Sequence, residues 1–325
     1  MSIYCNSGFE KKAGDHLTLI SFFAVFIGIF LYGMVIMRYG LYNLAQRRLQ
    51  NTLLYLTKTP LRGMIAGVFL TAILQSSSAV TVMTVALCSA GYLSFEKAIG
   101  IILGTNIGTT VTLELITIDF DSMIIPMLIA GVILISTQRK GWFECGSILL
   151  GFSLIIISMS GFSSLSDELQ ATSIFKMWQQ ANPSHYLSGV FVGTVLTALL
   201  QSSTAVTGIV MAIVEQPSFH LSTAISIMLG ANIGTCMTAY LASINGSEDA
   251  KLTAFAHIWL NIIGVVIFYP LIPFLTDVAL ILARTPDVQL AHASVLFNVL
   301  VSLLFLPIIR PFASFIKKLH GKRAN

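Results

Sequence analysis

The chain has 325 residues, of which 55% are hydrophobic and 10% charged, and its formal net charge is +4. Soluble domains carry about 25% charged residues. This composition, with a mean hydropathy of +0.85, therefore excludes an ordinary water-facing surface and indicates an integral membrane protein. The small positive charge does not indicate a nucleic-acid partner, because the basic residues gather at the ends of apolar segments, where they orient helices in a bilayer.

The first predicted membrane helix covers residues 17–38 and is followed by a basic amphipathic stretch at 41–57. Leu17–Met37 supplies the roughly 20 apolar residues that cross a hydrocarbon core. Basic residues crowd the connection after this span and the C-terminal end; they are Arg38, Arg47, Arg48, Lys58, Arg62, Lys317, Lys318, Lys322 and Arg323. The positive-inside rule predicts that both regions face the cytoplasm and that the N-terminus lies outside.

Four further helices are predicted outside the repeated blocks described below, at 122–138, 144–163, 252–275 and 288–309. A tight basic turn, Gln138–Gly141, joins the first two. The polar segment 163–183 is predicted to form an interfacial helix and a loop between two halves of the chain. The four cysteines show no spacing typical of a metal site or a disulfide, so neither a metal cofactor nor a cross-link is predicted.

Two polar blocks occur twice in the chain. TAILQSSSAVT at Thr71–Thr81 returns as TALLQSSTAVT at Thr197–Thr207, and LGTNIGTTVT at Leu103–Thr112 returns as LGANIGTCMT at Leu229–Thr238. The offset from Gln75 to Gln201 is 126 residues, and it holds for both blocks without a gap. Duplicated polar motifs in apolar surroundings are typical of transporters with internal repeats, whose substrate site lies where the copies meet. We predict one transporter domain, 1–325, with repeats at about 62–120 and 187–245.

Each repeat is predicted to contain a re-entrant helical hairpin. The apolar stretches Gly63–Leu74 and Ala79–Ala90 flank the first QSS block, and about a dozen residues span only ~18 Å. The later segment Ala98–Ile118 is long enough to cross, but glycines, an asparagine and threonines between 104 and 110 predict an unwound midpoint, as at 230–235 in the second copy. The predicted fold is therefore an all-α polytopic membrane protein of two inverted repeats, each with a hairpin and a broken transmembrane helix.

Broken helices inside a bilayer are tolerated where they line a polar site. Freed carbonyls, hydroxyls and amide oxygens are hard donors that suit Na⁺. Helix N-termini hold a phosphate-like anion without a buried cation, and neither QSS block contains lysine or arginine. The candidate ligands are Gln75, Ser76, Ser77, Ser78, Asn106, Thr109, Thr110, Gln201, Ser202, Ser203, Thr204, Asn232 and Thr235, with Na⁺ held by the same hydroxyls and nearby backbone carbonyls. No catalytic residue is predicted.

A structural interpretation competes with this one. A serine or threonine in a membrane helix often bonds the carbonyl four residues back or permits close helix packing. That explanation suits single hydroxyls better than a Gln-Ser-Ser block that occurs twice. His257 and Asn261 share a helix face, for which an interhelical hydrogen bond is the leading interpretation; Ser294 and Asn298 repeat the spacing. Glu114 is expected near the membrane edge, with an ion-coupling role as the alternative.

At these motifs the chain resembles the type II sodium-dependent phosphate cotransporters in their short prokaryotic form, without the PhoU-like domain of many relatives. The motifs are QSSS at Gln75–Ser78, QSST at Gln201–Thr204, TNIGTT at Thr105–Thr110, ANIGT at Ala231–Thr235 and FAHIWLNIIGVVIFYP at Phe255–Pro270. The resemblance implies Na⁺-coupled transport of inorganic phosphate across a prokaryotic cell membrane, by a transport unit that moves against a scaffold.

The chain departs from this pattern at Thr204, which replaces a serine, and at Cys236, which replaces the hydroxyl of Thr110. It also lacks a carboxylate that animal relatives use for an additional Na⁺, so the number of coupled ions is open. Export, transport of another tetrahedral oxyanion, and a non-transporting sensor are the alternatives. An enzyme is disfavoured because the apolar segments contain no HExxH, GxSxG or paired-carboxylate motif. The oligomeric state, including a homodimer, also stays open.

Overall fold

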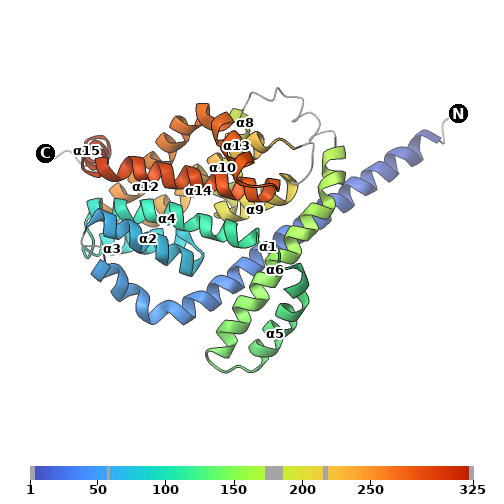
Figure 1. The fold of residues 1–325 in the computed structure, drawn as a ribbon, viewed down its shortest axis with the longest axis horizontal. Coiled ribbons are helices and arrows are strands. Elements are labelled where there is room, and N and C mark those ends of the chain that lie inside the picture. The colour runs from blue at the N-terminus through green and yellow to red at the C-terminus, as the bar shows by residue number, and fades with distance from the viewer. Residues whose placement is uncertain (1–3, 57–58, 173–185, 215–218, 322–325) are drawn as a thin grey trace.

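The structure, a computed structural model, describes residues 4–56, 59–172, 186–214 and 219–321. Every regular element in these ranges is a helix, which confirms the all-α prediction (Figure 1). The α-helices are α1 (Tyr4–Leu56), α2 (Pro60–Leu74), α3 (Ser77–Ser89), α4 (Phe95–Ile116), α5 (Ile124–Ser136), α6 (Trp142–Ala171), α8 (Tyr186–Leu200), α9 (Ser203–Val214), α10 (Leu221–Gly234), α11 (Cys236–Ser243), α12 (Glu248–Phe268), α13 (Ile272–Leu282), α14 (Pro286–Phe305) and α15 (Ile309–His320).

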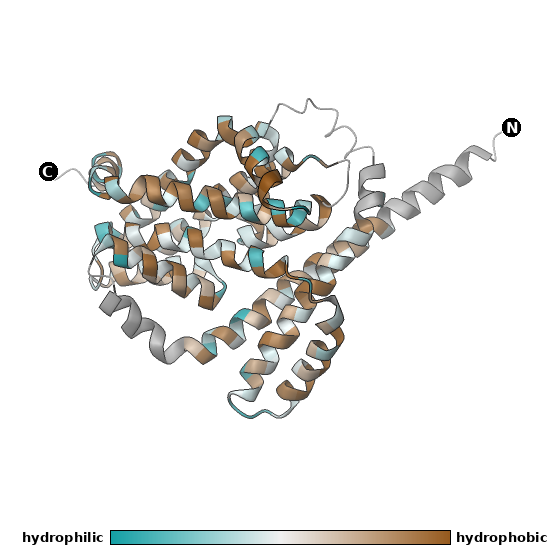
Figure 2. Ribbon diagram, viewed as in Figure 1, coloured by the Kyte–Doolittle hydropathy of each residue, from teal (hydrophilic) through white to brown (hydrophobic). Residues whose placement is uncertain are grey.

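Six stretches of the described chain are long and apolar enough to cross a membrane. They are Thr18–Ala45, Phe95–Ile116, Trp142–Leu165, Leu221–Ser243, Glu248–Leu282 and Pro286–His320. Large hydrophobic side chains are exposed both on these stretches, as at Ile281, and on shorter apolar helices, as at Ile125 and Phe191, which suits contact with lipid. Figure 2 shows hydrophobic residues along most of the helices and hydrophilic ones gathered at several connections. The protein is a multi-pass membrane protein.

The first helix is longer than the sequence predicted. The separate elements expected at 17–38 and 41–57 are one helix, α1, that runs to Leu56, so that division was wrong. Gly40, which could have ended the first element, instead lies where α1 crosses α6, and a side chain there would meet the carbonyl of Glu144. A glycine at a close helix crossing permits contact between backbones without ending the helix. Residues 57–58, 173–185 and 322–325, on which parts of the basic and polar segments fall, lie outside the described residues.

Helices α1, α5 and α6 form one group beside the rest of the molecule (Figure 1). α1 crosses α6 again at Gly33 and Gly151, where each glycine faces the backbone of the other. The turn between α5 and α6 lies where it was predicted, with Gln138 and Gly141 at positive φ. α6 also packs against α9.

The remaining helices form a bundle in which the two repeats pack in the same way. Gly104 and Gly108 of α4 face α2 one helical turn apart, and a side chain at Gly104 would strike the carbonyl of Met64. A Cβ at Gly108 would lie 2.6 Å from Cβ of Thr71. Small residues four apart let two helices approach closely. These glycines therefore serve packing between α2 and α4.

The second repeat copies this packing at an offset of 126 residues. Gly230 and Gly234 of α10 face α8, where a side chain at Gly230 would strike the carbonyl of Val190. A Cβ at Gly234 would lie 2.6 Å from Cβ of Thr197, the counterpart of Thr71. α2 with α4 and α8 with α10 are thus equivalent helix pairs.

This packing corrects one part of the predicted fold. The unwound midpoint expected between 104 and 110 is absent, because α4 runs without interruption from Phe95 to Ile116. In the second copy the helix is interrupted at one residue, Thr235, between α10 and α11. The helical hydrogen bonds of α4 survive its glycines because close contact with α2 compensates for their low helix propensity.

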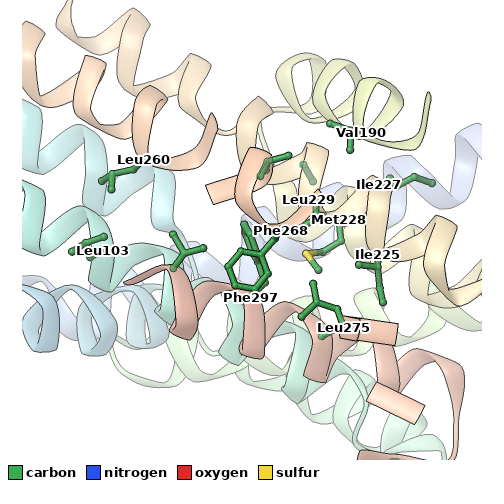
Figure 3. Close-up of a cluster of buried hydrophobic side chains, with 14 of the residues drawn as sticks. Leu103, Val190, Ile225, Ile227, Met228, Leu229, Leu260, Phe268, Leu275 and Phe297 are labelled. Carbon is green, nitrogen blue, oxygen red and sulfur yellow. The ribbon is translucent and has the colours of Figure 1, made fainter. Parts of the chain in front are cut away.

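One large apolar cluster joins the repeats to the C-terminal helices. It contains Leu103 of α4, Met228 of α10 and Leu260 of α12, and its centre is an edge-to-face pair formed by Phe268 and Phe297, with ring centroids 5.2 Å apart (Figure 3). Aromatic pairs in this geometry add stability beyond the area that they bury. α12 and α14 thus hold the two repeats together.

Four helix ends meet at one end of the bundle. The backbone amide of Phe95 at the start of α4 donates to Asp249 at the start of α12 over 3.3 Å. Lys317 of α15 pairs with Glu96 at 2.8 Å, and the amide of Ser247 donates to the hydroxyl of Ser89 at the end of α3. These contacts place the basic end of α15 beside the start of α4.

Candidate functional site: two hairpin tips and a buried amide chain

The two QSS motifs adopt the same backbone conformation. α2 ends at Leu74, and Gln75 follows with φ of 51° in the left-handed region; Gln201, after α8, has φ of 53°. A residue other than glycine rarely adopts this conformation, and such strain persists where the surrounding structure imposes it. The duplicated glutamine therefore marks a duplicated sharp turn between two short helices.

The serine after each glutamine caps the next helix. The amide of Ala79 donates to Oγ of Ser76 over 3.2 Å, and the amide of Ala205 donates to Oγ of Ser202 over the same distance. The amides one and two residues after each cap belong to the first helical turn and have no acceptor within their own helix. They are those of Ser77 and Ser78 in α3, and of Ser203 and Thr204 in α9. We call the turns at Gln75–Ser78 and Gln201–Thr204 the first and second tips. Each tip therefore presents a helix N-terminus with donors suited to an anion.

The two tips differ in their surroundings. Gln75 is only 6% exposed, and its Nε2 donates to the carbonyl of Ala72 over 2.6 Å. Its Oε1 is buried without a hydrogen-bond partner. Gln201 is exposed, whereas Ser202, Ser203 and Thr204 after it are buried. The buried group at the first tip is thus a glutamine with an unpartnered acceptor, whereas the buried groups at the second tip are three hydroxyl side chains.

A cation lies at the first tip. Nε of Arg38, in the middle of α1, donates to the backbone carbonyl of Gln75 over 2.7 Å. Arg38 is partly buried and lies inside the apolar stretch Thr18–Ala45. Sequence reasoning placed it at a segment end as an orienting charge. The missed signal was that an apolar sequence, Tyr39-Gly40-Leu41, continues beyond it.

The asparagines of the two NIG motifs are joined by a third asparagine. Nδ2 of Asn106 in α4 donates to Oδ1 of Asn261 in α12 over 2.8 Å. Nδ2 of Asn261 in turn donates to the backbone carbonyl of Asn232 in α10, also over 2.8 Å. This agrees with the interhelical hydrogen bond expected for Asn261. Its neighbour His257 is buried with Nδ1 unpartnered.

The candidate threonine hydroxyls donate to backbone carbonyls three or four residues earlier in the chain, as expected for structural threonines. Oγ1 of Thr109 donates to the carbonyl of Thr105 over 2.7 Å, that of Thr110 to Ile107 over 2.8 Å, and that of Thr235 to Ala231 over 2.9 Å. Each hydroxyl oxygen keeps lone pairs that can accept a bond or bind a cation. These bonds fix the orientation of the hydroxyl groups and leave their oxygen lone pairs able to accept.

Each hairpin packs against the other repeat. α3 of the first copy contacts α11 of the second, and α9 of the second contacts α4 of the first. Among the described residues no hydrogen bond joins Gln75–Ser78 directly to Gln201–Thr204. The structure therefore interlocks the repeats and connects their NIG motifs through Asn261, whereas the two QSS motifs are not linked by such a bond in the described part of the chain.

Three other polar features were missed or left open by the sequence. Oγ1 of Thr71 and of Thr197 are buried without partners at equivalent positions in α2 and α8. Glu114 contacts Nδ1 of His292 at 2.8 Å, with about a third of each side chain exposed. Asn298 donates to the carbonyl of Ser294 within its own helix, and this pair makes no interhelical hydrogen bond to the residues that the structure describes.

The profile of the Na⁺/Pi-cotransporter family matches this chain twice in succession, at residues 29–164 and 159–282. The chain belongs to that family. Its members are transporters and not enzymes, and the two matches each contain one QSS and one NIG motif. No solved structure matches the chain.

Individual members of the family resemble the chain to different extents. It is 39% identical to the uncharacterized protein YqeW of Bacillus subtilis over 91% of this chain and 96% of that protein. It is 22% identical to the putative inorganic phosphate export protein YjbB of Escherichia coli over 93% of this chain, but that alignment covers 55% of YjbB. It is 32% identical to the rat sodium-dependent phosphate transport protein 2C over 43% of this chain and 24% of that protein. The chain thus spans about half of the export protein that it resembles.

Proposed function

We propose that this protein is a secondary active transporter that couples Na⁺ to the movement of inorganic phosphate. The observation that carries the proposal is the pair of QSS tips, each with a strained glutamine, a capping serine and a helix N-terminus inside an apolar bundle. An anion at such an end receives amide hydrogen bonds and the favourable helix dipole. Family membership and the phosphate transport for which two relatives are named support phosphate as the substrate.

We assign the ligands by the type of atom that each offers. The phosphate oxygens would accept from the first-turn amides of α3 and α9 and from the hydroxyls of Ser77, Ser78, Ser203 and Thr204. Na⁺ prefers hard neutral or anionic oxygens, which Gln75 supplies with its unpartnered Oε1. The remaining candidates, Ser76, Asn106, Thr109, Thr110, Gln201, Ser202, Asn232 and Thr235, supply further oxygens or hold the two sites in place.

The proposed architecture has two inverted repeats with re-entrant hairpins. α2 and α3 have 15 and 13 residues, roughly 20 Å each, too short to cross a hydrocarbon core of about 30 Å. Inversion requires an odd number of crossings between equivalent points of the repeats. We propose that α4, α5 and α6 provide three. α5 has only 13 residues, but the 3₁₀ turn Asp121–Met123 leads directly into it and lengthens this segment to roughly 25 Å. We further assign α1, α5 and α6 to the scaffold and the interlocked repeats to the transport unit.

A direct test is radiolabelled phosphate uptake into proteoliposomes under an inward Na⁺ gradient, compared with an equal K⁺ gradient. We expect uptake with Na⁺ alone. Equal uptake under both gradients would exclude Na⁺ coupling, and no uptake by folded protein would favour another oxyanion or a sensor. The resemblance to an export protein makes the reverse direction the second candidate, tested with phosphate loaded inside the vesicles.

The inverted relation predicts opposite exposure of equivalent residues. Ser94 and His220 precede α4 and α10 at the same 126-residue offset, and both are exposed. In a background without the other cysteines, Ser94→Cys should react with an impermeant thiol reagent from the cytoplasmic side and His220→Cys from the outside. Labelling of both from one side would contradict the inversion and the crossing of α5.

A further inference from the structure

Arg38 is an isolated cation inside the apolar part of the protein. Its bond to the carbonyl of Gln75 is its only hydrogen bond to the described residues, and no carboxylate there pairs with it. A charged residue within a membrane span is costly and usually pairs with another charge or lines a substrate path. The guanidinium has five N–H donors, of which this bond uses one. Its terminal nitrogens are therefore available to a ligand.

The place of these free donors is specific. The carbonyl that Arg38 contacts belongs to the strained turn that precedes the N-terminus of α3. The same turn contains Oε1 of Gln75, an unpartnered acceptor in a side chain that is 94% buried. The charged oxygens of phosphate accept hydrogen bonds from a guanidinium, and the Na⁺ assigned to Oε1 of Gln75 would lie beside the same anion. A guanidinium fork also matches two phosphate oxygens at once.

A purely structural role for Arg38 would be to hold the turn. The second copy argues against this, because Gln201 adopts the same conformation, with φ of 53° against 51°, and no cation of the described chain bonds to its carbonyl. The turn therefore forms without an arginine. What Arg38 adds to the first tip is positive charge.

We propose that Arg38 is a ligand of the transported oxyanion at the first tip, where it neutralises charge beside the N-terminus of α3. This inference rests on the proposed function and deepens it. It makes the substrate site asymmetric: the first tip binds the anion through a fixed cation, and the second binds it only through amides and hydroxyls.

Protection of the wild-type protein from an arginine reagent tests the proposal first. Purified protein is treated with phenylglyoxal with and without inorganic phosphate at matched ionic strength, and modification is measured by peptide mass spectrometry. Phosphate should slow the modification of Arg38 several-fold and leave Arg62, which is exposed at the start of α2, unaffected. Equal modification of Arg38 with and without phosphate would overturn the proposal. If Arg38 does not react in either condition, the variants below decide.

The variants are Arg38→Met, Arg38→Lys and, as a matched control, Arg62→Met, each measured for phosphate uptake and thermal stability. We expect Arg38→Met to raise the KM for phosphate at least 10-fold with the KM for Na⁺ within about twofold. Arg38→Lys should be intermediate, and Arg62→Met should equal wild type. An unchanged KM in Arg38→Met, or equal losses in the Met and Lys variants with lowered thermal stability, would refute the ligand role. If Arg38→Met does not fold, the KM of Arg38→Lys decides alone.

The outcomes separate this inference from the proposed function. Absence of Na⁺-driven uptake by the wild-type protein would contradict the transport proposal, whatever the state of Arg38. Normal wild-type uptake with unprotected Arg38 and an unchanged KM in Arg38→Met would contradict only the role of Arg38. Protection of Arg38 in a protein that does not transport phosphate would keep the anion site and assign it to another activity.

Discussion

The two QSS hairpins have the same turn in different surroundings. At both tips a left-handed glutamine ends one short helix and a serine caps the next. The first glutamine is buried beside Arg38, whereas the second is exposed and its neighbouring hydroxyls are buried. The same local sequence gives the same turn and the same serine cap in both copies. The helices packed around each turn determine what it can bind.

The NIG helices differ in a complementary way. α4 is continuous, while its counterpart is interrupted at Thr235, next to the carbonyl of Asn232 that accepts from Asn261. The first copy thus has a cation at its QSS turn and a continuous NIG helix, whereas the second has an interrupted NIG helix. A site built between such copies is asymmetric although its sequence is nearly repeated.

The largest predicted effect concerns the packing that the copies share. Gly104→Val and Gly230→Val should each abolish or severely reduce folded protein, because the new side chain would strike the backbone of α2 or α8. Overpacking a tight contact costs about 1–3 kcal/mol or more. Thermal stability and monodispersity measure the effect. Gly28→Ala is the control, since no atom lies within 4 Å of a Cβ built there. If Gly230→Val kept the thermal stability of the wild type while Gly104→Val lost it, only the first copy would need the close packing.

The second prediction tests whether both tips take part in transport. Gln75→Ala and Gln201→Ala should each lower Na⁺-driven phosphate uptake about 10-fold or more, because the loss of one buried polar partner costs about 1–3 kcal/mol. Gln138→Ala is a matched control, because Gln138 has the same left-handed φ of 51° in the turn between α5 and α6. Its uptake should be normal. Normal uptake in Gln201→Ala alone would mean that the exposed tip is not part of the site.

The third prediction concerns the asparagine chain between the copies. Asn261→Ala leaves Nδ2 of Asn106 and the carbonyl of Asn232 without their partner, and buried unsatisfied groups cost about 1–3 kcal/mol. The midpoint of thermal unfolding should fall by several degrees, at about 2–4 °C per kcal/mol. Asn298→Ala should cost less, because the bonds of Asn298 to the described residues stay within its own helix. Equal losses would show that the bridge contributes no more than an ordinary buried amide.

The smallest effect is expected where the copies differ by one side chain. Cys236 stands where the first copy has Thr110. Its sulfur donates weakly to the carbonyls of His257 at 3.5 Å and Asn232 at 3.8 Å, and it accepts from Nδ2 of Asn261 at 3.2 Å. Cys236→Thr should therefore keep uptake within about twofold, since weak thiol bonds contribute little. A larger gain in apparent Na⁺ affinity would indicate that this position limits ion binding in the second copy.

Much of the fold could be predicted because its signals are local. Composition and apolar lengths predicted a polytopic α-helical membrane protein, and short apolar stretches around a polar block predicted the paired short helices. The unwound midpoint of α4 was predicted wrongly because glycine has two roles. Its low helix propensity is visible in the sequence, but the close approach of α2 that overrides it is a tertiary contact. The length of α1 was missed for the same reason at Gly40.

The candidate site could be predicted in its residue types and only partly in its arrangement. The repeated motifs select the candidate residues, whose role in binding stays a prediction, and the structure gives the glutamine and first serine of each motif a place in a turn and a helix cap. Arg38 could not be assigned to the site, because 37 positions separate it from the carbonyl that it contacts. The link between Asn106 and Asn232 through Asn261 likewise depends on three helices that meet only in the folded bundle.

By itself the sequence determined the membrane environment, the helices, the duplication and the family, because these follow from composition, apolar length and repeated motifs along the chain. The tertiary structure alone decided that α4 stays continuous, that an asparagine bridges the repeats and that the guanidinium of Arg38 lies at the first tip. The physical reason is that hydrogen bonds and close packing act over a few ångströms in space. Separation along the chain does not show which distant residues come that close in the folded protein.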